Sequence, residues 1–151
     1  MFEKTSWQQP LVSIYWDYQN VSNIKIAKDS LLLANSLGCI NNRKVYSNWC
    51  NASKVKKALE NLNFDCIHVG NKFKNAVDFK IVMDCVCDNS DISILISGDS
   101  YCEILIDDLH LKSKKVVILA QEKSVRNSLK FLADKFYYTS ELKNLFRNRL
   151  D

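Results

Sequence analysis

The 151-residue sequence has few residues that interrupt regular structure, with only three glycines and one proline. This composition argues against long disordered linkers and against collagen-like or low-complexity segments. No apolar run approaches the roughly 20 residues that span a bilayer, and the first ten residues lack the apolar stretch of a signal peptide. We therefore expect a soluble, cytoplasmic protein with no membrane partner, in which residues 1–10 form a flexible N-terminus.

Signals for disulfides or for a zinc site are also weak. The six cysteines include no Cys-x-x-Cys pair, and only His68 and His110 could complete a zinc site with them. A chain of this size and apolar content does not need disulfides to be stable, and no secretion signal is visible. We expect buried, reduced thiols.

The residues that are present suit one folded domain, residues 1–151. Hydrophobic residues make up 47% of the chain, which is enough to bury a core. The formal net charge of +4 permits a polyanionic partner without demonstrating one.

Short apolar runs alternate with segments of helical periodicity along the whole chain. This alternation predicts an α/β fold, a Rossmann-like three-layer sandwich with a mostly parallel central sheet. In such a sheet, functional groups gather beyond the carboxyl ends of the strands. The expected strands are 11–16, 43–49, 65–70, 92–97, 115–120 and 136–138, and the expected helices are 28–38, 53–62, 76–87, 101–111, 124–134 and 140–149.

Three aspartates fall where this arrangement would bring them to one edge. Asp17 directly follows the strand 11–16, Asp99 follows the strand 92–97 after a tight turn, and Asp78 lies in the first turn of the helix 76–87. Carboxylates that approach one another repel, and a hard cation with oxygen ligands, Mg²⁺ or Mn²⁺, relieves the repulsion. Each aspartate taken alone could equally be a turn residue or a helix cap.

Three segments in order along the chain resemble the motifs of the NYN domain family. They are IYWDYQNV (14–21), KNAVDFKIVMD (74–84) and ILISGDSYCEIL (94–105). The resemblance covers nearly the whole chain and implies a PIN-like fold and a metal-dependent ribonuclease acting on single-stranded or structured RNA. It implies catalytic metal ligands at Asp17, Asp78 and Asp99, supported by Asn20 and Ser97.

The third motif departs from the family in one place. The family usually has an aspartate two residues after the Gly-Asp pair, where this chain has Tyr101. Glu103, one helical turn beyond Asp99, could supply the missing metal ligand or could be a surface residue. Asp84 lies about 120° around the helix from Asp78, so we interpret it as solvated or as supporting the ligands. Asn20 could orient a water or a phosphate, or could cap a turn.

Candidate RNA contacts surround the same edge. Lys72 and Lys74 precede Asp78 and could bind phosphates, and Phe73 between them could stack on a base. Tyr18, next to Asp17, is a candidate aromatic contact. Solvated lysines and a packed Phe73 are equally compatible with this pattern.

Other functional classes fit less well. A haloacid-dehalogenase-type phosphatase would need a second aspartate at Gln19, and neither a P-loop nor a GxGxxG motif is present. No serine or cysteine has a convincing histidine partner. The remaining competitors are a related module that holds RNA or a protein without cutting it, favoured by Tyr101, and a structural or regulatory partner that binds neither RNA nor metal.

Overall fold

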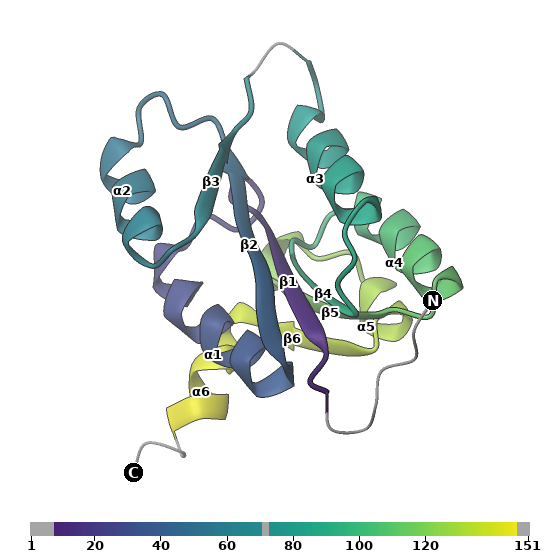
Figure 1. Cartoon of the computed structure of the whole chain (residues 1–151). Coiled ribbons are helices and arrows are strands. Elements are labelled where there is room, and N and C mark those ends of the chain that lie inside the picture. Colours follow the sequence, from purple (N-terminus) through teal and green to yellow (C-terminus); the bar gives the residue numbers. More distant parts are fainter. Residues whose placement is uncertain (1–7, 71–72, 148–151) are drawn as a thin grey trace.

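The computed structural model describes residues 8–70 and 73–147, whose strands form one six-stranded parallel sheet (Figure 1). The strands are β1 (Leu11–Asp17), β2 (Cys39–Ser47), β3 (Asp65–His68), β4 (Ile92–Ile96), β5 (Lys115–Ala120) and β6 (Lys135–Tyr138). The helices are α1 (Ala27–Leu37), α2 (Ser53–Asn61), α3 (Ala76–Val86), α4 (Tyr101–Leu111), α5 (Leu129–Leu132) and α6 (Thr139–Arg147), with short 3₁₀ turns η1 (Ile24–Ile26) and η2 (Glu122–Ser124). Residues 1–7 of the predicted flexible N-terminus lie outside the described residues.

Helices cover both faces of the sheet, which confirms the three-layer α/β prediction. Helices α1, α2 and α6 lie over one face, and α3, α4 and α5 lie over the other (Figure 1). Side chains alternate along the central strands between two cores: Ile14 and Trp16 of β1 enter the first, and Tyr15 enters the second. Because β1 and β4 are buried on both faces, their sequences are nearly continuous apolar runs. Each fully buried isoleucine there contributes about 1.5–3 kcal/mol.

The order of the strands fixes where a site can form. The sheet runs β3-β2-β1-β4-β5-β6, so the chain builds outward from β1 on one side and from β4 on the other. The two halves meet between β1 and β4, where Trp16 pairs in register with Ile96. The strand order changes direction at this point, and such a change leaves a crevice beyond the carboxyl ends of the two strands. Asp17 and Ser97 emerge side by side at this point.

One predicted helix was wrong in extent. The periodicity of residues 124–134 predicted a helix, but only Leu129–Leu132 forms α5. Val125 is extended instead, and the Arg126 N–H donates to the Gly98 carbonyl at 2.9 Å. The segment therefore bonds to the loop after β4, which competes with its own helical hydrogen bonds.

Strand β2 begins earlier than predicted, at Cys39 rather than at residue 43. The added part of the strand contains two asparagines, whose side chains are hydrogen-bonded within the fold. Asn41 donates to Asn89 Oδ1 at 3.1 Å and Asn42 donates to Ser13 Oγ at 3.3 Å. Pairing with β1 then extends the strand to its full length. At the other edge of the sheet, β3 ends at His68, two residues earlier than predicted.

The cysteines only partly follow the expectation of buried thiols. All six are unpaired, and Cys85 and Cys102 are buried, but Cys39, Cys50 and Cys87 are exposed. Cys39 begins β2, Cys87 follows α3 and Cys50 lies in the turn between β2 and α2, where the core does not cover them. Within residues 8–70 and 73–147, no helix combines the length and apolar character needed to cross a bilayer.

Candidate functional site

Asp17, the last residue of β1, is the most buried carboxylate at the carboxyl edge of the sheet, with 3% of its surface exposed. Its Oδ1 accepts from the Asn20 backbone N–H at 3.2 Å. Its Oδ2 accepts from the Tyr101 hydroxyl at 3.1 Å and from Ser97 Oγ at 3.4 Å. Burial raises the pKa of Asp17, and these hydrogen bonds oppose the shift. The side chain is therefore held in one orientation at an energetic cost that a cation would offset.

The turn after β4 is bonded to the turn after β1. The Gly98 N–H donates to Asn20 Oδ1 at 2.9 Å, which joins the two strand ends directly. Ser97 Oγ, which donates to Asp17, also accepts from the Asp99 N–H at 3.3 Å. Asn20 and Ser97 thus hold the backbone and Asp17 in place.

Asp78, in the first turn of α3, is electrostatically coupled to the two strand-end aspartates. Its own burial, followed by the negative charges of Asp17 and Asp99, raises its pKa from 3.8 to about 6. Charges act in this way only over short distances, so the fold brings the three aspartates to one edge, as the spacing predicted. Their role as metal ligands stays a prediction.

The shift at Asp78 predicts a pH dependence of stability in the metal-free protein. Because the folded-state pKa lies above the unfolded value, the folded state binds the proton more tightly. The resulting stabilisation is present below about pH 4 and is lost as the pH rises through about 6. Between about pH 4.5 and 7.5, wild type should lose about 1 kcal/mol of unfolding free energy relative to Asp78→Asn, since solvent screens part of the interaction. Urea unfolding in EDTA measures this difference, and parallel pH profiles for the two proteins would contradict it.

The three aspartates do not form a closed cage. In the part of the chain that the structure describes, no three His, Cys, Asp or Glu side chains are close enough to hold a metal ion together. Mg²⁺, however, keeps several waters and binds through one or two carboxylates together with substrate phosphates. The hard oxygen donors of Asp17, Asp78 and Asp99 and their mutual repulsion fit such an open site.

Tyr101 is a site residue that the sequence analysis did not include. It stands where the family usually has an aspartate, and its hydroxyl donates to Asp17 Oδ2. Burial raises the pKa of Tyr101 well above its usual value, so the group stays protonated and remains a donor. The departure from the motif was the available signal, but it was interpreted as the loss of a ligand rather than as the gain of a hydrogen bond.

Glu103 does not take the place of the missing carboxylate. Its Oε1 accepts from Arg126 Nε at 2.8 Å and from Ser128 Oγ at 2.5 Å. These two partners hold the pKa of Glu103 below its ordinary value. The Glu103 carboxylate is therefore bonded to the segment that precedes α5. That segment is the part of the predicted 124–134 helix that did not form.

Asp84 is also turned to other partners. Its Oδ2 accepts from the Tyr46 hydroxyl at 2.7 Å and its Oδ1 pairs with Lys80 at 3.1 Å. The bond to Tyr46, which belongs to β2, ties α3 to the sheet. This structural contact does not support a role for Asp84 beside the ligands.

The candidate RNA contacts differ in whether they are packed, exposed or outside the described residues. Tyr18 packs between Trp16 and Trp49, with both pairs of ring centroids 5.6 Å apart. Lys74 is exposed in the loop before α3, whereas Lys72 lies outside the described residues. No contact in the structure tests the RNA-binding role of these residues.

Comparison with known proteins agrees with the fold and the motifs. The chain is similar to the crystal structure of a protein of unknown function from Vibrio parahaemolyticus RIMD 2210633, with a TM-score of 0.73 and 20% sequence identity over 89% of this chain and 96% of that one. At this identity the likeness concerns the fold alone. No curated protein matches the sequence. The family model described as the NYN domain matches residues 11–142. The chain therefore belongs to the NYN domain family.

Proposed function

We propose that this chain is a metal-dependent ribonuclease that hydrolyses RNA phosphodiester bonds at the edge formed by Asp17, Asp78 and Asp99. The observation that carries the proposal is the Asp17 carboxylate, only 3% exposed and held by hydrogen bonds where β1 and β4 end. Burial and the charges of Asp17 and Asp99 also raise the pKa of Asp78. A fold gains no stability from concentrating negative charge, and strongly perturbed carboxylates in a crevice are typical of functional sites. The nuclease-like character of the family agrees with this reading.

The roles of the side chains follow from their surroundings. Asp17 is oriented by its three hydrogen bonds and would bind Mg²⁺ or Mn²⁺ directly, while Asp78 and Asp99 would contribute negative charge and contacts through coordinated waters. Once bound, the cation would neutralise phosphate charge and lower the pKa of a coordinated water. The pKa of Asp78 is about 6 without metal, and a bound cation would lower it and keep the carboxylate ionised near neutral pH. Exposed Lys74, in the loop before α3, would attract the RNA backbone.

A cleavage assay tests the proposal. Wild type should cut single-stranded or stem-loop RNA in Mn²⁺ or Mg²⁺, and EDTA should stop the reaction. Asp99→Asn should be at least about tenfold slower, because it removes one ligand charge. Glu103→Gln serves as the matched control and should cut at the wild-type rate, because its carboxylate contacts Arg126 and Ser128. Equal cleavage by wild type and Asp99→Asn would place the activity at another site.

A second function, RNA binding without cleavage, is favoured by the neutral Tyr101 side chain. Its hydroxyl occupies one Asp17 oxygen where the family usually contributes another charge. RNA retained by wild type in a binding assay, with no cleavage in either metal and no heat of Mn²⁺ binding by calorimetry, would support this alternative. Absence of both RNA and metal binding would favour a structural or regulatory partner.

A further inference from the structure

Beside the aspartates, helix α3 presents a second, apolar surface that the proposed chemistry does not use. Phe79 and Met83 lie one helical turn apart on its outer face and are 67% and 61% exposed. Phe73, from the loop before α3, is 76% exposed. Single exposed apolar residues are ordinary, but a gathered group usually marks a binding surface.

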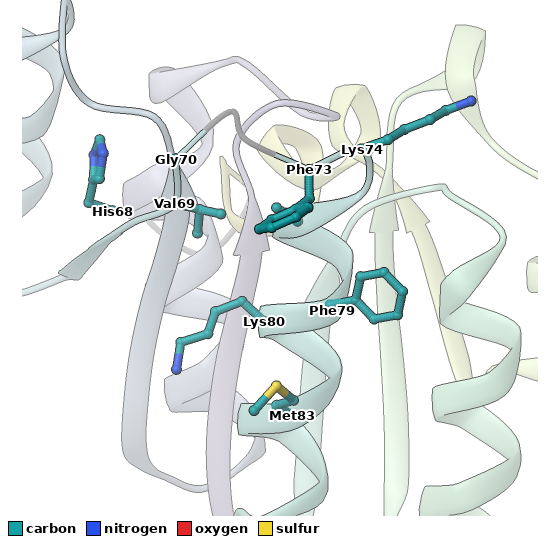
Figure 2. A pocket seen from close by; sticks show the side chains of 9 residues that line it. His68, Val69, Gly70, Phe73, Lys74, Phe79, Lys80 and Met83 are labelled. Carbon is teal, nitrogen blue, oxygen red and sulfur yellow. The ribbon is translucent and has the colours of Figure 1, made fainter.

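These three side chains border one pocket of about 650 Å³. His68, Val69 and Gly70 form its other side, at the end of β3. In Figure 2 the Phe73 ring lies over the first turn of α3, and Met83 lies further along the same helix. The volume lies within the range of about 300–1,000 Å³ that is usual for small-molecule sites. It has room for one nucleobase with its sugar.

The pocket lies on the same helix as Asp78, which does not itself line it. Asp78 and Phe79 are neighbours in the sequence and project about 100° apart around α3. An RNA strand with one base in the pocket would therefore pass close to the first turn of α3, where Asp78 lies. Lys74 and Lys80 also line the pocket and extend to opposite sides of it (Figure 2). Lys80 also pairs with Asp84 at 3.1 Å, whereas Lys74 is exposed before α3. A cation beside an aromatic surface suits a polyanion that carries flat bases.

We propose that this pocket holds an unpaired base of single-stranded RNA, stacked on Phe73 and Phe79, while the neighbouring phosphate lies toward Lys74. The proposal rests on the proposed ribonuclease function and adds its substrate class. A base inside a duplex is already stacked and paired, so only an unpaired base can enter. The described lining offers aromatic and aliphatic surfaces, which every base can contact, so binding should tolerate sequence changes.

Fluorescence anisotropy in EDTA tests the pocket without cleavage. The probes are a fluorescein-labelled RNA of about eight nucleotides, an abasic ribose-phosphate oligomer of equal length and an RNA duplex. Phe79→Ala should weaken binding of the base-containing single strand about tenfold, and Phe79→Trp should restore it. Phe131→Ala is the matched control, because Phe131 is 88% exposed on α5 and does not line the pocket. None of the variants should change binding of the abasic oligomer.

Several outcomes would overturn the proposal. Unchanged RNA binding by Phe79→Ala would remove the stacking role, and a loss of self-association in the same variant would show that the surface contacts protein instead. An equal loss for the abasic oligomer would show a purely electrostatic effect. If Phe79→Ala binds normally while Asp99→Asn abolishes cleavage, the pocket proposal fails and the nuclease proposal stands. If wild type never cuts but binding depends on Phe79, the nuclease proposal fails and base binding in the pocket stands.

Discussion

Asp17→Asn is expected to lower metal-dependent RNA cleavage by roughly 100-fold or more, while raising the stability of the metal-free protein. A bound divalent cation supplies several kcal/mol of transition-state stabilisation, and each 1.36 kcal/mol lost costs about tenfold in rate. Asp17 is the most buried of the three aspartates and is fixed by three hydrogen bonds. Loss of its charge should therefore damage the site most.

The gain in stability comes from removing the same buried negative charge. Burial raises the pKa of Asp17, so its ionised form disfavours the folded state at neutral pH. Asparagine keeps the shape, and its Oδ1 can still accept from the Asn20 N–H. Its amide nitrogen can donate to the Tyr101 and Ser97 hydroxyls, which are able to rotate and accept. The site is thus less stable with the charge that its activity needs.

Urea unfolding in EDTA and cleavage rates in Mn²⁺ measure the two effects on the same preparation. Asp107→Asn provides the matched control, since Asp107 is exposed on α4 and neither quantity should change. A loss of stability in Asp17→Asn would mean that the carboxylate supports the fold. Cleavage at the wild-type rate would mean that the metal is held elsewhere.

The order of the elements was predictable because it depends on local periodicity. Apolar runs buried on both sheet faces identify β1 and β4, and parallel pairing then places Asp17 and Asp99 at the same edge. This inference needs no side-chain geometry. The position of Asp78 followed from its place at the start of a helix, because helices in such folds begin at the carboxyl edge of the sheet.

The partners of individual side chains were not predictable in the same way. Glu103 was placed beside the aspartates by helical spacing alone, but spacing cannot show that Arg126 approaches from a distant segment. The same segment lost its predicted helix because it bonds to Gly98. The exposure of Phe79 and Met83 could have been predicted from the sequence, because both lie off the helical stripe formed by Val77 and Ile81. The pocket beside them required the loop that carries Phe73.

Gly98→Ala is expected to destabilise the protein by roughly 1–3 kcal/mol and to slow cleavage by about 100-fold. A Cβ atom at this position would lie 2.8 Å from the Ser124 carbonyl oxygen and 2.8 Å from Val125 Cα. Both are backbone atoms, so the chain itself must move. Gly98 also donates to Asn20 Oδ1 and accepts from the Arg126 N–H, so the movement would separate the turns that orient Asp17.

Gly70→Ala is the matched control for the loss of stability, because a Cβ atom there would meet nothing within 4 Å. Neither glycine has a positive φ, so the comparison isolates the effect of space from that of backbone strain. Urea midpoints give the stability of the two variants, and the cleavage rate of Gly98→Ala is compared with that of wild type at a temperature at which both are folded. A rate loss in folded Gly98→Ala would show that activity depends on the spacing between the β1 and β4 turns. Equal midpoints for the two variants, with cleavage by Gly98→Ala at the wild-type rate, would mean that the 124–126 segment moves without cost and does not set the position of Asp17.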